Sequence, residues 1–238
     1  RIGCDRKILY QNYITNLHRL YLDLYSVYQC CRQCLVGNLF QLLLQDSIYH
    51  FLMIQQNYFC YGMYLFVDGA RMGYGLGSEK NDVTLKDFAE LTDVFYIGGT
   101  KCGALFGEAV VITATALKRR FKAYMKQNGA VLAKGWLLGL QVAALLESGE
   151  YFAITKRADE LAMQIKKAFA GKNIPLWVDS YTNQQFVILN DEQKEKLSDK
   201  YIFELQGHSE KGTIVRFCTS WATTKDEVDS LIKDIDNL

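Results

Sequence analysis

The sequence lacks any long hydrophobic run and any strong excess of charge of one sign. Its longest apolar stretches, such as 35–44 and 109–112, fall short of the ~18 residues that a membrane helix needs. Half of the 238 residues are hydrophobic and the net charge is +1, which is unlike the strongly basic pattern of nucleic-acid-binding proteins. We therefore expect a packed globular chain that binds neither a membrane nor a nucleic acid.

The first sixty residues lack Ala, Glu and Pro altogether, and they hold only two of the 18 Gly but five of the 7 Cys. Natural domains rarely omit both Ala and Glu over such a length. Residues 35–60 also show no clean period of 2 or 3.6. Two explanations stay open for this atypical segment, residues 1–60. It is either a divergent helical stretch or a replacement of the original sequence by a frameshift or gene fusion. Because the chain starts at Arg1 and not at Met, we also expect the natural N-terminus to be missing.

The seven cysteines are odd in number and irregularly spaced. Cys31-x-x-Cys34 has the spacing of a redox pair or of half a zinc site. Neither His18 nor His50 completes a zinc site at a suitable distance. We expect reduced thiols, a cytoplasmic location and no bound metal.

From residue 61 onward the sequence predicts strands that alternate with helices, as in an α/β layer followed by an α+β layer. Its strand-like runs are 63–67, 94–97, 109–113, 176–178, 186–189 and 213–218. Its helix-like runs are 84–91, 117–127, 130–147, 151–170, 191–200 and the stretch after Thr224. We expect the apolar run 63–67 to be covered on both faces and the Leu- and Ala-rich run 130–147 to be largely buried. A domain boundary near 148–150 would separate a first unit, 61–148, from a second unit, 149–238.

Asp68 and Lys101 carry the chemistry that is easiest to interpret. Asp68 ends the first of these strand-like runs, and Lys101 follows the second within Gly98-Gly99-Thr100-Lys101. Pyridoxal phosphate (PLP) enzymes use a carboxylate beside the pyridine nitrogen and a lysine amine that binds the aldehyde. The glycines allow the backbone to approach a flat cofactor. The alternatives are a helix N-cap for Asp68 and a solvated loop lysine for Lys101.

Three further residues are candidates for binding the cofactor or the substrate. Thr100 is placed to offer a hydroxyl to the cofactor phosphate. Arg71 and Arg216 suit a substrate carboxylate, because a guanidinium binds that group through two parallel hydrogen bonds; a structural salt bridge is the alternative for each. The run Gly73-x-Gly75-x-Gly77 lacks the spacing of a dinucleotide loop, so we interpret it as a flexible or small-residue-packed segment. His208 has polar neighbours and is expected at the surface.

Over residues 61–238 the chain resembles the low-specificity threonine aldolases of the fold-type-I, PLP-dependent β-eliminating lyase family. The matching motifs are LFVDGAR at 65–71, DVFYIGGTK at 93–101, GEAVVI at 107–112, AKG at 133–135, TNQQF at 182–186 and VRFCTSWAT at 215–223. The resemblance implies a fold-type-I PLP-dependent transferase-like fold, as a fragment of the large PLP-binding domain with a smaller α+β C-terminal domain.

The resemblance also implies roles for individual residues. Lys101 would bind PLP, Asp68 would pair with its ring nitrogen, and Arg71 and Arg216 would bind the α-carboxylate. The reaction would be the cleavage of threonine or allo-threonine to glycine and acetaldehyde, in a homodimer or homotetramer. Transamination, β-elimination or a non-catalytic remnant of a decayed gene remain alternatives. The family's Gly-rich phosphate cup and ring-stacking histidine are not recognisable in residues 1–60, so we expect this chain to be truncated or altered at its N-terminus.

Overall fold

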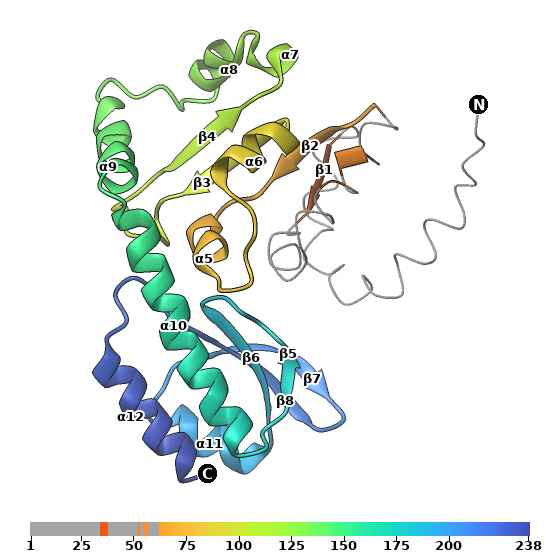
Figure 1. Cartoon of the computed structure of the whole chain (residues 1–238), viewed down its shortest axis with the longest axis vertical. Coiled ribbons are helices and arrows are strands. Elements are labelled where there is room, and N and C mark those ends of the chain that lie inside the picture. The colour runs from red at the N-terminus through yellow and green to blue at the C-terminus, as the bar shows by residue number, and fades with distance from the viewer. Residues whose placement is uncertain (1–33, 38–51, 53–54, 57–61) are drawn as a thin grey trace, which may run out of the picture.

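The computed structural model describes residues 34–37, 52, 55–56 and 62–238. Its first sheet has the strand order β1-β2-β3-β4 (Figure 1). The strands are β1 (Cys34–Gly37), β2 (Tyr64–Val67), β3 (Val94–Gly98) and β4 (Glu108–Ile112). The first three strands are parallel and β4 is antiparallel. A parallel core with an antiparallel edge strand is common in α/β folds.

Only one face of this sheet is fully buried by the described residues. Leu65, Val67, Phe95 and Ile97 point into a core built with α5 (Met72–Gly77) and α6 (Leu85–Leu91). The alternate residues of β2 and β3 are half-buried, so the prediction that the 63–67 run is covered on both faces is wrong. A continuous apolar run does not distinguish a strand buried on both faces from one whose second face is apolar but partly open.

The start of α6 agrees with the sequence, whereas the predicted helix 117–127 is interrupted. The side chain of Thr84 accepts a hydrogen bond from the backbone of Asp87, and Asp87 bonds back to Thr84 in a complete capping box. In place of one helix, α7 (Thr115–Lys118) and α8 (Phe121–Gln127) are separated at Arg120. Arg120 has a φ of 60°, in the left-handed region, which ends a right-handed helix.

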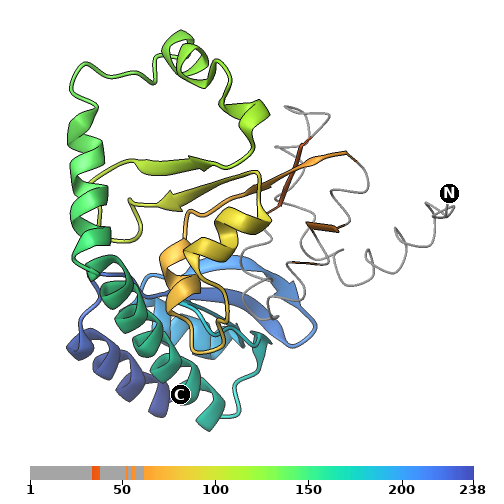
Figure 2. The same cartoon turned by 45° about the horizontal axis from the view of Figure 1, so that its top comes forward.

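Helix α9 (Trp136–Glu147) differs most from expectation, because none of its residues is buried. Trp136 is 64% exposed and Leu140 is 58% exposed. The prediction that this segment is largely buried is wrong for the described part of the chain, since nothing there covers the outer side of α9 (Figure 2). Composition showed that the helix is apolar around its whole circumference, but composition does not show what covers it.

Helix α10 (Glu150–Gly171) runs unbroken from the first sheet to the second (Figure 1). Its first half contributes Tyr151 and Ala158 to the core of the first sheet, and its second half contributes to the core of the second. Gly73 on α5 faces Tyr151 and Thr155 so closely that a Cβ there would lie 2.7 Å from the Thr155 methyl. This contact confirms the small-residue packing expected for the glycine run, although the run forms a helix that the sequence did not predict.

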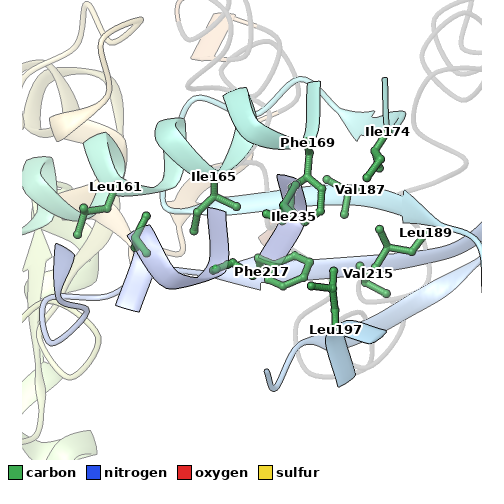
Figure 3. Packing of buried hydrophobic residues seen from close by; sticks show 12 residues of the cluster. Leu161, Ile165, Phe169, Ile174, Val187, Leu189, Leu197, Val215, Phe217 and Ile235 are labelled. Carbon is green, nitrogen blue, oxygen red and sulfur yellow. The ribbon is translucent and has the colours of Figure 1, made fainter. Parts of the chain in front are cut away.

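The second sheet has the strand order β5-β6-β8-β7, and all its neighbouring strands are antiparallel. Its elements are β5 (Leu176–Val178), β6 (Gln184–Leu189), α11 (Asp191–Ser198), β7 (Glu204–Ser209), β8 (Gly212–Cys218) and α12 (Lys225–Asp236). Figure 3 shows Phe169 of α10, Phe217 of β8 and Ile235 of α12 meeting in the core of this sheet. Only β7 among these elements had no counterpart in the sequence prediction.

Within the described ranges, no single helix is both long and apolar enough to cross a membrane. Helices α9 and α10 pass that test only as a pair, with a bend of 68° between them.

A buried carboxyl group lies between α10 and α5. Asp159 is 3% exposed, and neither of its side-chain oxygens has a hydrogen-bond partner among the described residues. A Cβ on Gly77 would lie 3.0 Å from Asp159 Oδ2. Burial raises the pKa of Asp159 to about 9, an effect that the nearby Asn183 backbone amide partly opposes and the neighbouring Glu160 charge increases. Asp159 is therefore a neutral acid in the folded chain at pH 7.

We expect Asp159 to destabilise the fold as the pH rises. The folded pKa of about 9 lies above the ordinary value of 3.8, so the stabilising contribution is complete below pH 4 and is lost progressively from pH 4 to pH 9. Asp159→Asn stays neutral throughout, so its free energy of unfolding should exceed that of the parent by on the order of 3 kcal/mol at pH 8. Urea denaturation at pH 4.5 and pH 8 measures this difference, with Glu195→Gln, an exposed change on α11, as control. A difference that is independent of pH would contradict the prediction.

Candidate functional site

Asp68 lies immediately after β2, at the carboxyl end of the parallel strands, as predicted. It is half-buried, and its Oδ1 accepts hydrogen bonds from the backbone N–H of Ala70 at 3.0 Å and from the Tyr96 hydroxyl. It is not a helix N-cap, because Arg71 occupies that position of α5. Both of these hydrogen bonds are made by Oδ1, and the described residues make no hydrogen bond to Oδ2.

Lys101 lies in the loop between β3 and β4, and its side chain is exposed. Its main-chain carbonyl accepts a hydrogen bond from the buried Tyr74 hydroxyl. The same loop is fixed at Gly98, whose carbonyl accepts from Tyr151 at 3.0 Å, and at Gly99, whose N–H donates to Glu108 at 2.5 Å. The loop backbone is therefore held by side chains while the lysine amine stays accessible.

Two glycines bring the Asp68 and Lys101 loops into direct backbone contact. The Gly98 N–H donates to the Gly69 carbonyl at 2.9 Å. A Cβ on Gly69 would lie 1.7 Å from the Tyr96 carbonyl oxygen, and one on Gly98 would lie 2.4 Å from the Ala70 carbonyl oxygen. No side chain fits in either gap, so glycine at both positions is a condition of bringing these loops together.

Arg216 is on β8, directly opposite Glu204 of β7 and Phe186 of β6. Its guanidinium forms an ion pair with Glu204 and donates to the Gln184 side chain at 2.8 Å. Its buried Nε has no partner among the described residues. Arg216 therefore has the salt bridge that was the alternative interpretation of the sequence, and it also bonds the Gln184 side chain.

The charges of three candidate site residues act on the thiol of Cys218, which is exposed at the end of β8. Partial burial of the sulfur raises the pKa of this thiol and the Glu204 charge raises it further, whereas the positive charges of Arg216, Arg71 and Lys101 lower it. These three charges come from the N-terminus of α5, the loop between β3 and β4, and strand β8. The loops that carry Asp68 and Lys101 are in direct backbone contact through Gly69 and Gly98, and the charges of Arg71 and Arg216 act on the same thiol as that of Lys101.

Sequence reasoning did not single out Tyr74, Tyr96, Glu108 or Cys218. A signal was present for Tyr96, because β2 and β3 are parallel with Phe66 opposite Val94, so Asp68 and Tyr96 fall on the same face. None was present for Tyr74, since its contact with Lys101 depends on how α5 docks.

The other candidates are less informative. Thr100 is exposed beside Lys101, and His208 is exposed on β7, as expected for a surface residue. No cluster of three metal-binding side chains occurs within the residues that the structure describes. His18, His50 and Cys31 lie outside the described residues, so the zinc and redox interpretations of that segment remain sequence hypotheses.

No protein-family model matches the sequence. A low specificity L-threonine aldolase from Pseudomonas sp. (strain NCIMB 10558) is 29% identical over 182 residues, which cover 73% of this chain and 50% of that protein. The solved structure of threonine aldolase from Leishmania major is 37% identical with a TM-score of 0.75, over 82% of this chain and 55% of that one. The chain resembles the threonine aldolases.

A more distant structure supports the fold alone. Lysine aminotransferase from M. tuberculosis superposes with a TM-score of 0.52 at 14% identity, over 100% of this chain and 56% of that one. The described part thus has the mixed α/β architecture of the fold-type-I PLP enzymes, which confirms the predicted fold class. The chain spans about half the length of the threonine aldolases that it matches.

Proposed function

We propose that this chain carries the lysine-bearing part of a PLP-dependent threonine aldolase site, which cleaves a β-hydroxy amino acid such as threonine or allo-threonine to glycine and an aldehyde. The observation that supports this most is the backbone contact between the Asp68 turn and the Lys101 loop, in which the Gly98 N–H donates to the Gly69 carbonyl at 2.9 Å. The threonine aldolases of Pseudomonas and Leishmania major are the relatives that support the choice of reaction.

The described residues fit PLP on two counts. Asp68 is held through Oδ1, so Oδ2 can face a ring nitrogen and keep it protonated. Lys101 has an exposed amine on a fixed loop and can reach an aldehyde. When bound, PLP supplies the electron sink that allows the Cα–Cβ bond to break. Thr100 would contribute one hydroxyl to the phosphate.

Arg71 and Arg216 would bind the substrate carboxylate from two sides. Arg71 is at the start of α5, next to the Asp68 turn, whereas Arg216 belongs to the second sheet. A substrate carboxylate that binds Arg216 would either share the guanidinium with Glu204 or displace Glu204 from it. The Glu204 side chain is 63% exposed and can move aside. Orienting the carboxylate in this way fixes the direction of the Cα–Cβ bond relative to the ring.

The test of this proposal is where PLP attaches and which amino acid is then consumed. The purified chain is mixed with PLP and treated with borohydride, and the modified lysines are mapped by mass spectrometry. We expect modification to concentrate at Lys101, and glycine with acetaldehyde to form from threonine or allo-threonine. Labelling spread evenly over exposed lysines, such as Lys122 and Lys126, would overturn the proposed cofactor site. Attachment at Lys101 with transamination or β-elimination in place of cleavage would overturn the proposed reaction only.

We further propose that the chain forms a homodimer or homotetramer through the α9 face, defined as Leu105, Phe106, Trp136, Leu137 and Leu140. These side chains are between 47% and 84% exposed. Gln141 of α9 joins the loop to the helix by bonding the Leu105 N–H at 2.9 Å and the Phe106 carbonyl at 2.5 Å. A large side chain presents ~200 Å² when fully exposed, and each of these five is only partly exposed. With those exposed fractions applied, pairing two such faces buries on the order of 1,200 Å², the lower end of the range for stable interfaces.

Sedimentation of the unmodified chain and of Leu140→Glu tests the α9 face. A charge there opposes burial against a second copy, so the variant should dissociate at least tenfold more readily. Leu205→Glu is the matched control, because Leu205 is 65% exposed on β7, away from α9. A monomeric parent chain, or equal behaviour of the two variants, would overturn this interface.

We keep a cytoplasmic location as a proposal, supported by the free thiols of Cys102 and Cys218 in the described part of the chain.

A further inference from the structure

Tyr74 connects the segments that carry the candidate site residues. It lies on α5 three residues after Arg71 and is 1% exposed. Its hydroxyl donates to the main-chain carbonyl of Lys101. Tyr151 and Glu108 bond to Gly98 and Gly99 of the same loop. Among the described residues, Tyr74 is the one whose side chain bonds to Lys101 itself.

The surroundings of the Tyr74 hydroxyl keep it a hydrogen-bond donor. Burial raises its pKa well above the ordinary value of 10.0, and the nearby Cys102 and Asp159 raise it further. The backbone amide of Trp221 and the charge of Arg71 oppose this effect without reversing it. Tyr74 therefore stays protonated over the pH range in which an enzyme works.

The position of Trp221 connects Tyr74 to the second sheet. Trp221 lies three residues after Cys218, and its carbonyl accepts from the Arg157 guanidinium at 2.7 Å. Thr219 in the same loop donates to the Ala158 carbonyl of α10 at 2.7 Å. The loop that follows Arg216 on β8 is thus fixed to α10 and lies beside the Tyr74 hydroxyl.

The Lys101 loop has little internal support of its own. The N–H groups of Cys102 and Ala104 both bond the Gly99 carbonyl, at 2.8 and 3.0 Å. Gly103 has a φ of 100°, which glycine adopts readily. A short loop with two internal hydrogen bonds needs outside contacts to hold one conformation, and Tyr74 supplies one where the reactive side chain branches from the backbone.

We propose that Tyr74 is a positioning residue that holds the Lys101 backbone so that the lysine amine reaches the cofactor aldehyde. This inference rests on the proposed function of Lys101. Tyr74 does not touch the reacting atoms, and it acts through the Lys101 carbonyl.

Tyr74→Phe tests the proposal, because it removes the hydroxyl and keeps the ring that fills the core. Tyr201→Phe is the matched control, since the Tyr201 hydroxyl, in the segment between α11 and β7, donates to Asp234 of α12 at 2.6 Å. Two quantities are measured for each variant. The first is amide hydrogen exchange of residues 99–104 without PLP. The second is the rate at which PLP becomes attached to Lys101, trapped with borohydride and mapped by mass spectrometry.

In Tyr74→Phe we expect exchange at Cys102 and Ala104 to accelerate about tenfold and attachment at Lys101 to slow about tenfold. Tyr201→Phe should change neither. Unchanged exchange in Tyr74→Phe, or equal acceleration in both variants, would overturn the positioning role. If Tyr74→Phe does not fold, Tyr74 is replaced by 4-aminophenylalanine, which keeps a hydrogen-bond donor. The amides of residues 99–104 should then exchange at the parent's rate, and faster exchange would also overturn the positioning role. If the parent itself does not attach PLP at Lys101, the proposed function fails, while the exchange result still decides whether Tyr74 holds the loop.

Discussion

Lys101→Ala is expected to abolish both the specific attachment of PLP and the cleavage of threonine. The backbone of the loop that carries Lys101 is held by side chains at three positions, Gly98, Gly99 and Lys101. Removing a nucleophile of this kind lowers turnover by roughly 10³-fold or more, because the remaining groups orient the substrate but cannot replace the covalent step. Release of acetaldehyde from threonine at saturating PLP measures the effect.

Two control variants distinguish the covalent role of the Lys101 amine from the effect of its positive charge. Lys101→Arg keeps the cation near Cys218 but removes the primary amine, so it should be as inactive as Lys101→Ala while preserving the electrostatics of the site. Lys122→Ala, an exposed change on α8, should keep the parent's activity. Substantial threonine cleavage by Lys101→Arg would mean that Lys101 acts only by charge, and the assignment of PLP to this lysine would be wrong.

Gly69→Ala is expected to destabilise the fold severely. Its Cβ would lie 1.7 Å from the carbonyl oxygen of Tyr96, which is part of the backbone of β3 and cannot move without disturbing the sheet. Relief of this clash requires β2 and β3 to separate, so we expect a loss of at least about 4 kcal/mol in the free energy of unfolding. Thermal denaturation followed by circular dichroism measures the loss.

Gly139→Ala provides the matched control, because nothing lies within 4 Å of the Cβ it would add on α9. In a helix, Gly→Ala is stabilising by about 1 kcal/mol, so this variant should melt at or above the parent's temperature. If Gly69→Ala melts with the parent, the Asp68 and Lys101 loops are not in the contact that the structure shows. A variant that folds with these loops apart should also lose the hydrogen bond between Tyr96 and Asp68.

The sequence predicted most of the elements after residue 62 because their signals are local. The capping residues Thr84 and Thr224 both form complete capping boxes, and the helices they start follow immediately. Predictions of burial failed where they depended on distant parts of the chain. Helix α9 is mostly apolar and yet has no buried residue. Strand β7, with polar residues and an exposed His208, has no apolar alternation to detect.

The sequence predicted those residues of the candidate site that lie at or after the ends of strands. Asp68 and Lys101 end or follow neighbouring strands, so their proximity follows from a parallel sheet. Arg216 comes from the other sheet, and its ion pair with Glu204 depends on the pairing of β7 with β8, which the sequence did not reveal. The hydroxyl contacts of Tyr74 and Tyr151 depend on helix docking, which has no local signal.

The unbroken course of α10 has a consequence for the cooperativity of unfolding. Tyr151 and Ala158 belong to the core of the first sheet, and Leu161 and Phe169, on the following turns, belong to the core of the second. Loss of either core would expose one half of the helix and weaken the other half, because helix propagation across the middle turn links them. The two sheets should therefore melt in a single transition, and a ligand that binds one of them should raise the melting temperature of both.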